Sequence, residues 1–114
     1  MTAYFTHVSD HTAFRADRLA KTDLFRGEHL FVGLNCFEAG QSQAIHTHAG
    51  ADKFYLLISG KARMRVGDEV REMGAGNVVW APAGVLHGVE SALARTVMLV
   101  GMTASRGVSA PGSQ

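Results

Sequence analysis

The stretch from His46 to Gly60 reads HTHAGADKFYLLISG and places a metal-chelating pattern directly before a strand pattern. One residue separates its two histidines, and a short loop, a carboxylate and an apolar run beginning near Phe54 follow them. If His46 and His48 lie on a strand, their imidazoles point to the same side, because side chains alternate with a period of two. Such a pair can chelate one metal ion, although an isolated pair is more often two surface histidines. The interpretation therefore depends on what the rest of the chain supplies.

Short β-rich runs surround this stretch from Leu30 onward. Glycines and polar clusters separate them, as in EAGQ, HAGAD, SGK, GDE, GAG and PAG. Runs with this spacing are typical of a β-sandwich or β-barrel, and the lack of long helical patterns between them disfavours a parallel α/β sheet. The run ARMRV (62–66) alternates, VMLV (97–100) is apolar on both faces as in a central strand, and Gly67-Asp68 is typical of a hairpin turn. We predict an all-β fold.

The two ends of the chain differ from this pattern. Residues 1–28 are predicted to form an N-terminal arm, in which a helix from Asp10 to Lys21 and an extended segment both remain open. Residues 29–104 are predicted to form the single barrel domain. Residues 105–114 are small and polar and contain Pro and Gly, which predicts a disordered tail.

The composition of the chain restricts its class. A chain of 114 residues can bury a core as one domain, and its one cysteine, Cys36, excludes an internal disulfide. A single cysteine favours a reducing, cytoplasmic location, and Cys36 is expected to be buried and inert in its apolar run. The net charge is +1 and no basic stripe is visible, which disfavours nucleic acid as a partner. Neither a signal-peptide pattern nor an apolar run of membrane-spanning length is found, so no membrane is expected as a partner.

A third histidine lies far downstream, in the stretch GNVVWAPAGVLHGVE (76–90). Pro82 ends the preceding strand, Gly84 allows a tight turn and His87 opens the next strand. If the sheets close into a barrel, His87 must lie near the first pair. Three neutral imidazoles suit Fe, Ni, Co, Cu or Zn, and an added carboxylate such as Asp52 makes Mn or Fe favourable.

These residues resemble the two motifs of the cupins. The first motif is G-x5-H-x-H-x3,4-E-x6-G, and the matching residues are Gly40, His46, His48, Asp52 and Gly60. The second motif is G-x5-P-x-G-x2-H-x3-N, and the matching residues are Gly76, Pro82, Gly84, His87 and, in place of the asparagine, Ser91. Fifteen residues separate the motifs, as in short microbial cupins.

The chain departs from the cupin pattern at the carboxylate. Asp52 replaces the glutamate, and seven residues separate it from Gly60 where the pattern has six. A strict count of six falls on Lys53, which cannot be a ligand while it is protonated. We therefore favour Asp52 as the fourth ligand, directly or through water. Lys53 could orient an anionic substrate, but strand alternation favours an outward side chain.

The resemblance implies a small jelly-roll β-barrel, or double-stranded β-helix, that holds one divalent transition-metal ion of the Fe, Mn, Ni, Co, Cu or Zn type. The ligands that it implies are His46, His48, His87 and, as the fourth, Asp52. Open positions on such an ion suit a dioxygenase or a Lewis-acid isomerase or lyase acting on a small organic molecule. The alternative is a module that binds or senses a small molecule or metal without catalysis. A metal-free scaffold is a third hypothesis.

Other residues carry expectations of their own. Asp52, as a base, and Tyr55, as a hydrogen-bonding partner of a ligand, are the candidate catalytic residues, although Tyr55 or Phe54 is first expected to face the core. Trp80 is expected to pack among apolar neighbours rather than line a pocket. Similar cupins commonly form homodimers with exchanged N-terminal strands, and the segment from Tyr4 to Val8 is the candidate strand here.

Overall fold

The computed structural model describes residues 4–104, so the predicted tail at 105–114 lies outside the described residues. The elements in chain order are η1 (Val8–Asp10), β1 (Ala20–Arg26), β2 (Leu30–Phe37), β3 (Gln43–His46), β4 (Lys53–Ser59), β5 (Lys61–Val66), β6 (Glu69–Gly74), β7 (Val78–Ala81), β8 (His87–Ala92) and β9 (Thr96–Thr103). The only helical element within residues 4–104 is the single 3-10 turn η1. No helix in this part of the chain is long and apolar enough to cross a membrane.

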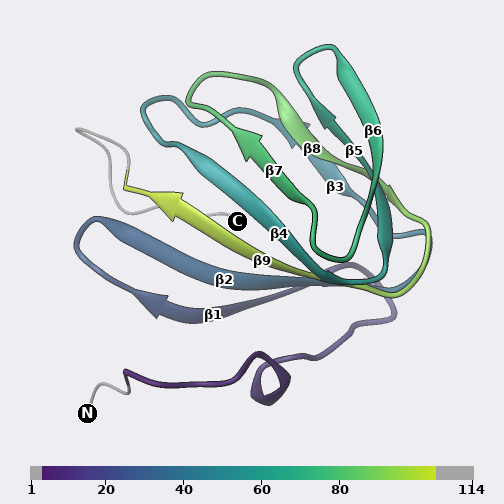
Figure 1. The fold of residues 1–114 in the computed structure, drawn as a ribbon, viewed down its shortest axis with the longest axis horizontal. Helices are drawn as coiled ribbons and strands as arrows, with labels where there is room; N and C mark the ends of the chain where they lie inside the picture. The colour runs from purple at the N-terminus through teal and green to yellow at the C-terminus, as the bar shows by residue number, and fades with distance from the viewer. Residues whose placement is uncertain (1–3, 105–114) are drawn as a thin grey trace.

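The strands form two facing antiparallel sheets (Figure 1). One sheet has the strand order β1-β2-β9-β4-β7, and the other has the order β3-β8-β5-β6. From β2 onward the chain passes repeatedly from one sheet to the other, so neighbouring strands come from distant parts of the sequence. This arrangement is a jelly roll, or double-stranded β-helix, and it confirms the predicted all-β fold.

The N-terminal arm contains a strand instead of the helix that the sequence left open. Residues 11–19 have no regular structure, and β1 begins at Ala20. Burial alternates along β1, with Ala20 buried and Leu24 half-buried, which is the period of a strand and not of a helix. β1 pairs with β2, with a register shift between Asp23 and Phe25. In Figure 1 the segment before β1 runs along the outer edge of the five-stranded sheet.

The main core lies between the two sheets. Its buried residues come from both sheets and are Phe37, Tyr55, Leu57, Ala62, Met64, Val79, Ala81, Val89, Ala92, Met98 and Val100. Met98 and Val100 belong to β9, which lies in the middle of the five-stranded sheet, as the apolar run at 97–100 predicted. Ala62 and Met64 point inward from β5 and confirm the alternation predicted there.

A two-residue turn joins β5 to β6, as Gly67-Asp68 predicted. Val66 pairs with Glu69 across the turn. Gly67 has a φ of +59°, and no residue other than glycine among those described has a positive φ. A positive φ at the first central residue alone is the type II′ pattern, which explains why glycine precedes aspartate here.

Two expectations about single residues have opposite outcomes. Cys36 is fully buried in a second apolar cluster, which confirms the prediction of a buried cysteine, and burial raises the pKa of its thiol. Trp80 was expected to pack among apolar neighbours, yet its side chain is 61% exposed. β7 is an edge strand, and its alternation turns Val79 inward and Trp80 outward.

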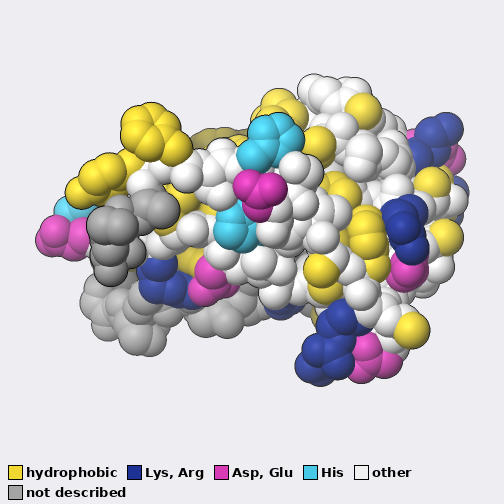
Figure 2. Space-filling view, turned by 90° about the horizontal axis from the view of Figure 1, so that it is seen from below, with side chains coloured by type: hydrophobic (Ala, Val, Ile, Leu, Met, Phe, Trp, Pro, Cys, Tyr) yellow, Lys and Arg dark blue, Asp and Glu magenta, His cyan; other side chains and the backbone are white. Residues whose placement is uncertain are grey.

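Charged side chains are dispersed over the surface. On the face shown in Figure 2, Lys and Arg side chains lie in small separate groups beside Asp and Glu. Among the ion pairs of the molecule, Arg95 pairs with Glu38 and Arg65 with Glu90, each at 2.8 Å. The described residues on the face in view form no continuous basic patch.

Candidate metal centre

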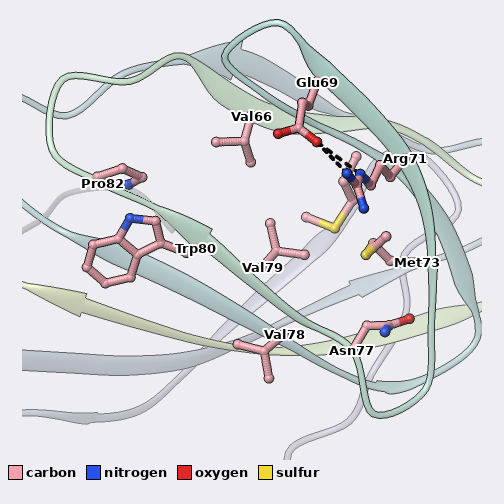
Figure 3. A pocket seen from close by; sticks show the side chains of 10 residues that line it. Val66, Glu69, Arg71, Met73, Asn77, Val78, Val79, Trp80 and Pro82 are labelled. Carbon is pink, nitrogen blue, oxygen red and sulfur yellow. Dashed lines mark hydrogen bonds and ion pairs between the residues drawn. The ribbon is translucent and has the colours of Figure 1, made fainter.

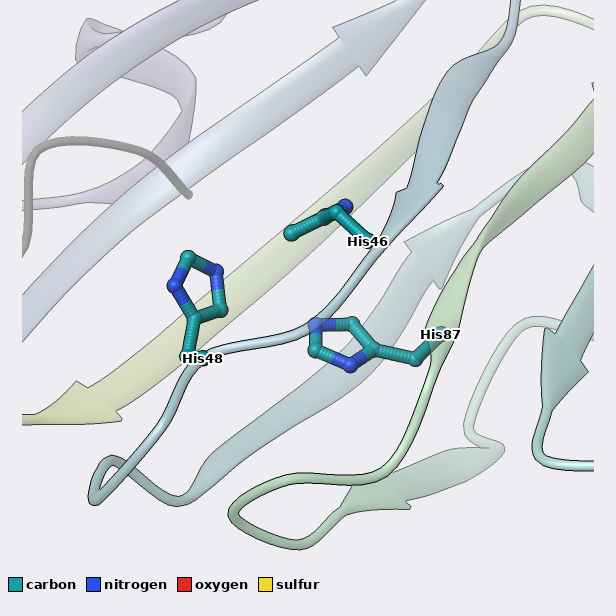
Figure 4. A group of neighbouring side chains, drawn as sticks. All are labelled: His46, His48 and His87. Carbon is teal, nitrogen blue, oxygen red and sulfur yellow. The ribbon is translucent and has the colours of Figure 1, made fainter.

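Three histidines come together at one end of the barrel (Figure 4). His46 is the last residue of β3, His48 lies in the loop before β4, and His87 is the first residue of β8. β3 and β8 are antiparallel neighbours, and His46 pairs directly with His87 in their register. The pairing of two strands from distant parts of the sequence therefore brings the three predicted ligands together.

A hydrogen bond between two loops fixes the backbone at His48. The loop after β7 passes beside the loop after β3, and the N–H of Gly84 donates to the carbonyl of His48 at 3.1 Å. Gly84 has a φ of +80°, which glycine adopts without strain. Pro82 directly follows β7 and cannot donate a further ladder bond. The proline and glycine of the second motif thus shape a loop that holds the first motif in place.

The three imidazoles form a group that could hold one ion. Their ligand nitrogens all lie within 4.8 Å of one another, and the ring centroids are 4.5, 4.7 and 5.6 Å apart. Nδ1 of His46 lies 2.6 Å from the carbonyl of Ala44, and Nδ1 of His87 lies 2.9 Å from that of Val85. Because a carbonyl only accepts, Nδ1 carries the proton in both rings and Nε2 keeps its lone pair.

The Nε2 atoms of all three rings are buried and have no hydrogen-bond partner among the described residues. Buried polar atoms in proteins are almost always paired, so three unpaired acceptors at one place call for an explanation. A single ion with nitrogen ligands would satisfy all three. The donor set therefore fits a divalent transition-metal ion.

The surroundings of the three rings favour their neutral form, which is the form that binds metal. Burial lowers the pKa of each histidine below its ordinary value of 6.5, and that of His48 to about 4. The positive charge of Lys53 also lowers the pKa of each ring, whereas the carbonyl bonds of His46 and His87 oppose the shift there. At neutral pH the three imidazoles are ready to act as ligands.

The predicted fourth ligand, Asp52, lies outside the histidine group. Its side chain is exposed, and Oδ1 accepts a hydrogen bond from the N–H of Ala83 at 2.9 Å. The N–H of Asp52 donates to Oγ1 of Thr103 at 2.9 Å. The carboxylate therefore joins the loop that carries His48 to the loop that leads to His87, and it supports the site from outside.

Lys53, and not Asp52, points into the barrel, so the prediction that it points outward is wrong. Only 1% of Lys53 is exposed. Lys53, Tyr55 and Leu57 share the buried side of β4, whereas Phe54 lies on the outer side. The large ring of Tyr55 sets the phase of the strand, and Lys53 follows it by alternation. The count of six residues before Gly60 in the cupin motif also ends at Lys53, so the motif spacing already indicated that Lys53 takes the inward position.

Tyr55 lies beside the histidine group. Its ring centroid is 6.3 Å from that of His87, and its hydroxyl donates to Oε1 of Gln43 at 2.8 Å. Burial raises the pKa of Tyr55, so its hydroxyl stays protonated. The expectation that Phe54 or Tyr55 faces the core is confirmed. Sequence analysis missed Gln43, because no motif surrounds it.

A groove of about 490 Å³, the hairpin groove, opens between β7 and the β5–β6 hairpin (Figure 3), and Val66 in its lining pairs with His87 in the register. Its lining includes Glu69, Arg71, Met73, Val78 and Trp80. Trp80 therefore lines a pocket, against the expectation from the sequence. Glu69 and Arg71 pair at 2.8 Å and are both largely exposed, so they are solvated as well as paired. The unpaired buried nitrogens lie at the histidine group instead, which makes that group the candidate site.

Residues 33–100 match the family model described as a cupin domain, and all three histidines lie in the matched part. The chain belongs to the cupin family. It is similar to the uncharacterized protein SCO3923 of Streptomyces coelicolor, with 36% identity in an alignment of 84 positions that covers 66% of this chain and 79% of that protein.

Solved structures share the whole fold. The crystal structure of TT1209 from Thermus thermophilus has a TM-score of 0.84 at 28% identity and covers 89% of this chain and 97% of its own. An RmlC-like cupin from Desulfovibrio desulfuricans has a TM-score of 0.80 at 22% identity, with 90% and 97% covered. KdgF from Halomonas sp. has a TM-score of 0.79 at 18% identity, with 93% and 97% covered. The last two likenesses concern the fold alone.

Proposed function

We propose that this cupin binds one divalent transition-metal ion through Nε2 of His46, His48 and His87, and uses it to bind and transform a small organic molecule. The observation that carries the proposal is the convergence of three buried Nε2 atoms without hydrogen-bond partners among the described residues. The carbonyls at Nδ1 of His46 and His87 orient two of the rings for this task.

The donor set narrows the choice of metal. Three neutral imidazoles suit Fe, Ni, Co, Cu or Zn, whereas Mn is better served when a carboxylate is added. Because Asp52 lies outside the histidine group, the first five ions are favoured over Mn. When bound, such an ion supplies Lewis acidity and open positions for a ligand or for dioxygen.

Residues around the ligands have distinct roles in this proposal. The ring of Tyr55 lies beside that of His87, and because its hydroxyl donates its one proton to Gln43, it is the candidate to accept a hydrogen bond from a bound molecule. Asp52 acts as a positioning residue, since its carboxylate accepts from Ala83 and lies outside the histidine group. The chemistry that we propose is that of a dioxygenase or of a Lewis-acid isomerase or lyase.

One observation favours a second candidate function, a module that binds a small molecule without catalysis. Among the described residues, the group that could hold the ion contains no carboxylate beside the three histidines. A general base next to the reacting atoms is then missing from that group, and catalysis would depend on the metal and the ligand.

The two candidates separate in one experiment. Metal-free protein is reloaded with Fe(II) or Co(II), and dioxygen uptake and product formation are followed with a panel of small organic acids and alcohols. The enzyme candidate predicts turnover that is lost in His48→Ala and kept in His29→Ala, because His29 is an exposed histidine outside the group. Saturable binding without turnover over the whole panel supports the module instead. If neither ion binds in a stoichiometric amount, the metal-dependent enzyme candidate fails.

We also propose that the protein is a cytoplasmic homodimer. The buried free thiol of Cys36 fits a reducing compartment. Tyr4 and Phe5 are 85% and 91% exposed on the segment proposed for strand exchange, and Trp80 is exposed on the edge strand β7. Light scattering should give about 24 kDa, twice the 12.2 kDa of one chain. A mass of one chain at micromolar concentration would contradict the dimer.

A further inference from the structure

Lys53 is a buried amine inside the same end of the barrel as the histidines. It lies on the inward side of β4, between Ala81 of β7 and Met102 of β9 in the register. Only 1% of the residue is exposed, and Nζ has no hydrogen-bond partner among the described residues. Nζ lies over the ring of Tyr55, 4.7 Å from its centroid. Such a contact attracts a cation but does not neutralise it.

The charges around Lys53 are positive or neutral. The Tyr55 ring under its Nζ is 6.3 Å from the ring of His87, centroid to centroid, and the charge of Lys53 lowers the pKa of His46, His48 and His87. Burial, together with the nearby charge of Lys21, lowers the pKa of Lys53 itself to about 7. Lysine is rarely buried without a partner, because an unpaired ammonium loses its hydration. The interior thus holds one buried amine beside three neutral imidazoles.

The adjacent carboxylate does not offset this charge. Asp52 is exposed and accepts from the N–H of Ala83. At the position that six residues separate from Gly60, where the cupin motif has glutamate, this chain has a cation. If a divalent ion is bound by the histidines, it adds further positive charge beside Lys53. An anion that touches both the ion and the amine would be attracted by both charges.

We propose that Lys53 is the recognition residue for an anionic ligand, a small carboxylate that binds the ammonium with one oxygen and the open side of the metal site with the other. This inference rests on the proposed function. The ligand is small because Nζ and the three Nε2 atoms are all buried. A bound carboxylate also raises the pKa of Lys53 again, so that the amine is charged in the complex.

The test uses full-length protein loaded with Co(II), whose visible absorption reports on ligands that reach the metal. Acetate and oxalate are the anionic probes, and acetamide and oxamide are their neutral counterparts. The variants are Lys53→Met, which keeps the length of the side chain without its charge, and Lys61→Met, an exposed lysine at the start of β5 that serves as the matched control.

Wild type and Lys61→Met should bind one Co(II) per chain and the carboxylates more tightly than the amides. Lys53→Met should keep the Co(II) and lose carboxylate affinity by about tenfold or more, the effect of one hydrogen bond to a charged group. If Lys53→Met fails to fold, Lys53→Gln takes its place with the same expectation.

The outcomes distinguish the two proposals. Unchanged carboxylate affinity in the Lys53 variant, with Co(II) still bound, overturns the recognition role and leaves the metal site intact. Loss of Co(II) binding in the Lys53 variant alone shows that the amine is itself a metal ligand, and this result also overturns the recognition role. Loss of Co(II) binding in wild type overturns the metal site and the recognition role together.

Discussion

Two regions of the barrel, the histidine site and the hairpin groove, differ in the burial and pairing of their polar side chains. At the histidine site, Nε2 of the three histidines and Nζ of Lys53 are buried without hydrogen-bond partners among the described residues. In the hairpin groove, the charged residues Glu69 and Arg71 pair with each other and remain largely exposed. The groove has a volume of about 490 Å³, yet its described residues hold no such unsatisfied nitrogen. Unpaired buried nitrogens, rather than open volume, mark the site here, because only a ligand can satisfy them.

The largest contrast is expected in metal affinity. His46→Ala removes one of three ligands, and the affinity for Co(II) should fall by more than about 100-fold, beyond the loss typical of residues that only support a ligand. Trp80→Ala, in the hairpin groove, should leave it unchanged. Titration of metal-free protein followed by absorption measures both constants. Equal losses in the two variants would show that the two regions are not distinct.

Replacing Lys53 should increase the stability of the metal-free protein. Lys53→Met replaces a buried amine without a hydrogen-bond partner among the described residues by an apolar side chain of similar length, and the free energy of unfolding of the metal-free protein should rise by about 1–3 kcal/mol. The exposed control Lys61→Met should stay within about 0.5 kcal/mol of wild type. Urea denaturation gives both values. A destabilised Lys53→Met would mean that the amine has a compensating partner.

Replacing Asp52 should reduce metal affinity less than replacing a histidine ligand, because Asp52 acts through the backbone. Asp52→Ala removes the hydrogen bond to Ala83 that joins the two histidine loops, and metal affinity should fall by about tenfold. Asp68→Ala, in the turn beside the hairpin groove, is the matched control and should have no effect on metal. Calorimetric titration measures the two affinities. A loss as large as that of His46→Ala would instead make Asp52 a ligand.

The smallest effect concerns pH. The folded-state pKa of His48 is lowered to about 4 from an ordinary value of 6.5, and those of His46 and His87 are also lowered. Below pH 6.5 these histidines bind protons in the unfolded chain that they do not bind in the folded chain, so their contribution to stability is full above that pH and falls toward pH 4. The melting temperature of metal-free wild type should therefore drop by a few degrees between about pH 7.5 and about pH 5. His48→Gln should drop less, and an equal drop would contradict the assignment.

Much of this molecule could be predicted from local patterns. The alternation at 62–66, the doubly apolar run at 97–100 and the turn at Gly67 gave strands and a hairpin that the structure has. The spacing of the two motifs brought three histidines together, because strand pairing converts that spacing into proximity. These features depend on side-chain period and turn geometry, which a sequence displays directly.

The predictions from the sequence were wrong or incomplete at features that depend on which face of a strand is buried, or on contacts between loops. Lys53 was placed outside because alternation does not say which of Phe54 and Tyr55 is buried, and the structure buries Tyr55. Trp80 lies outward for the same reason on β7. The position of Asp52 outside the histidine group could not be predicted either, because its hydrogen bond to Ala83 joins two loops and leaves no trace in the sequence. Strand phase and contacts between loops are set by the tertiary fold.

The most direct test of the central claim is elemental analysis of protein purified without a histidine tag. Wild type should contain about one transition-metal ion per chain, because three imidazoles converge on one point. His48→Ala and His87→Ala should each contain almost none, while His29→Ala should match wild type. Full metal occupancy in both His48→Ala and His87→Ala would contradict the assignment of this site.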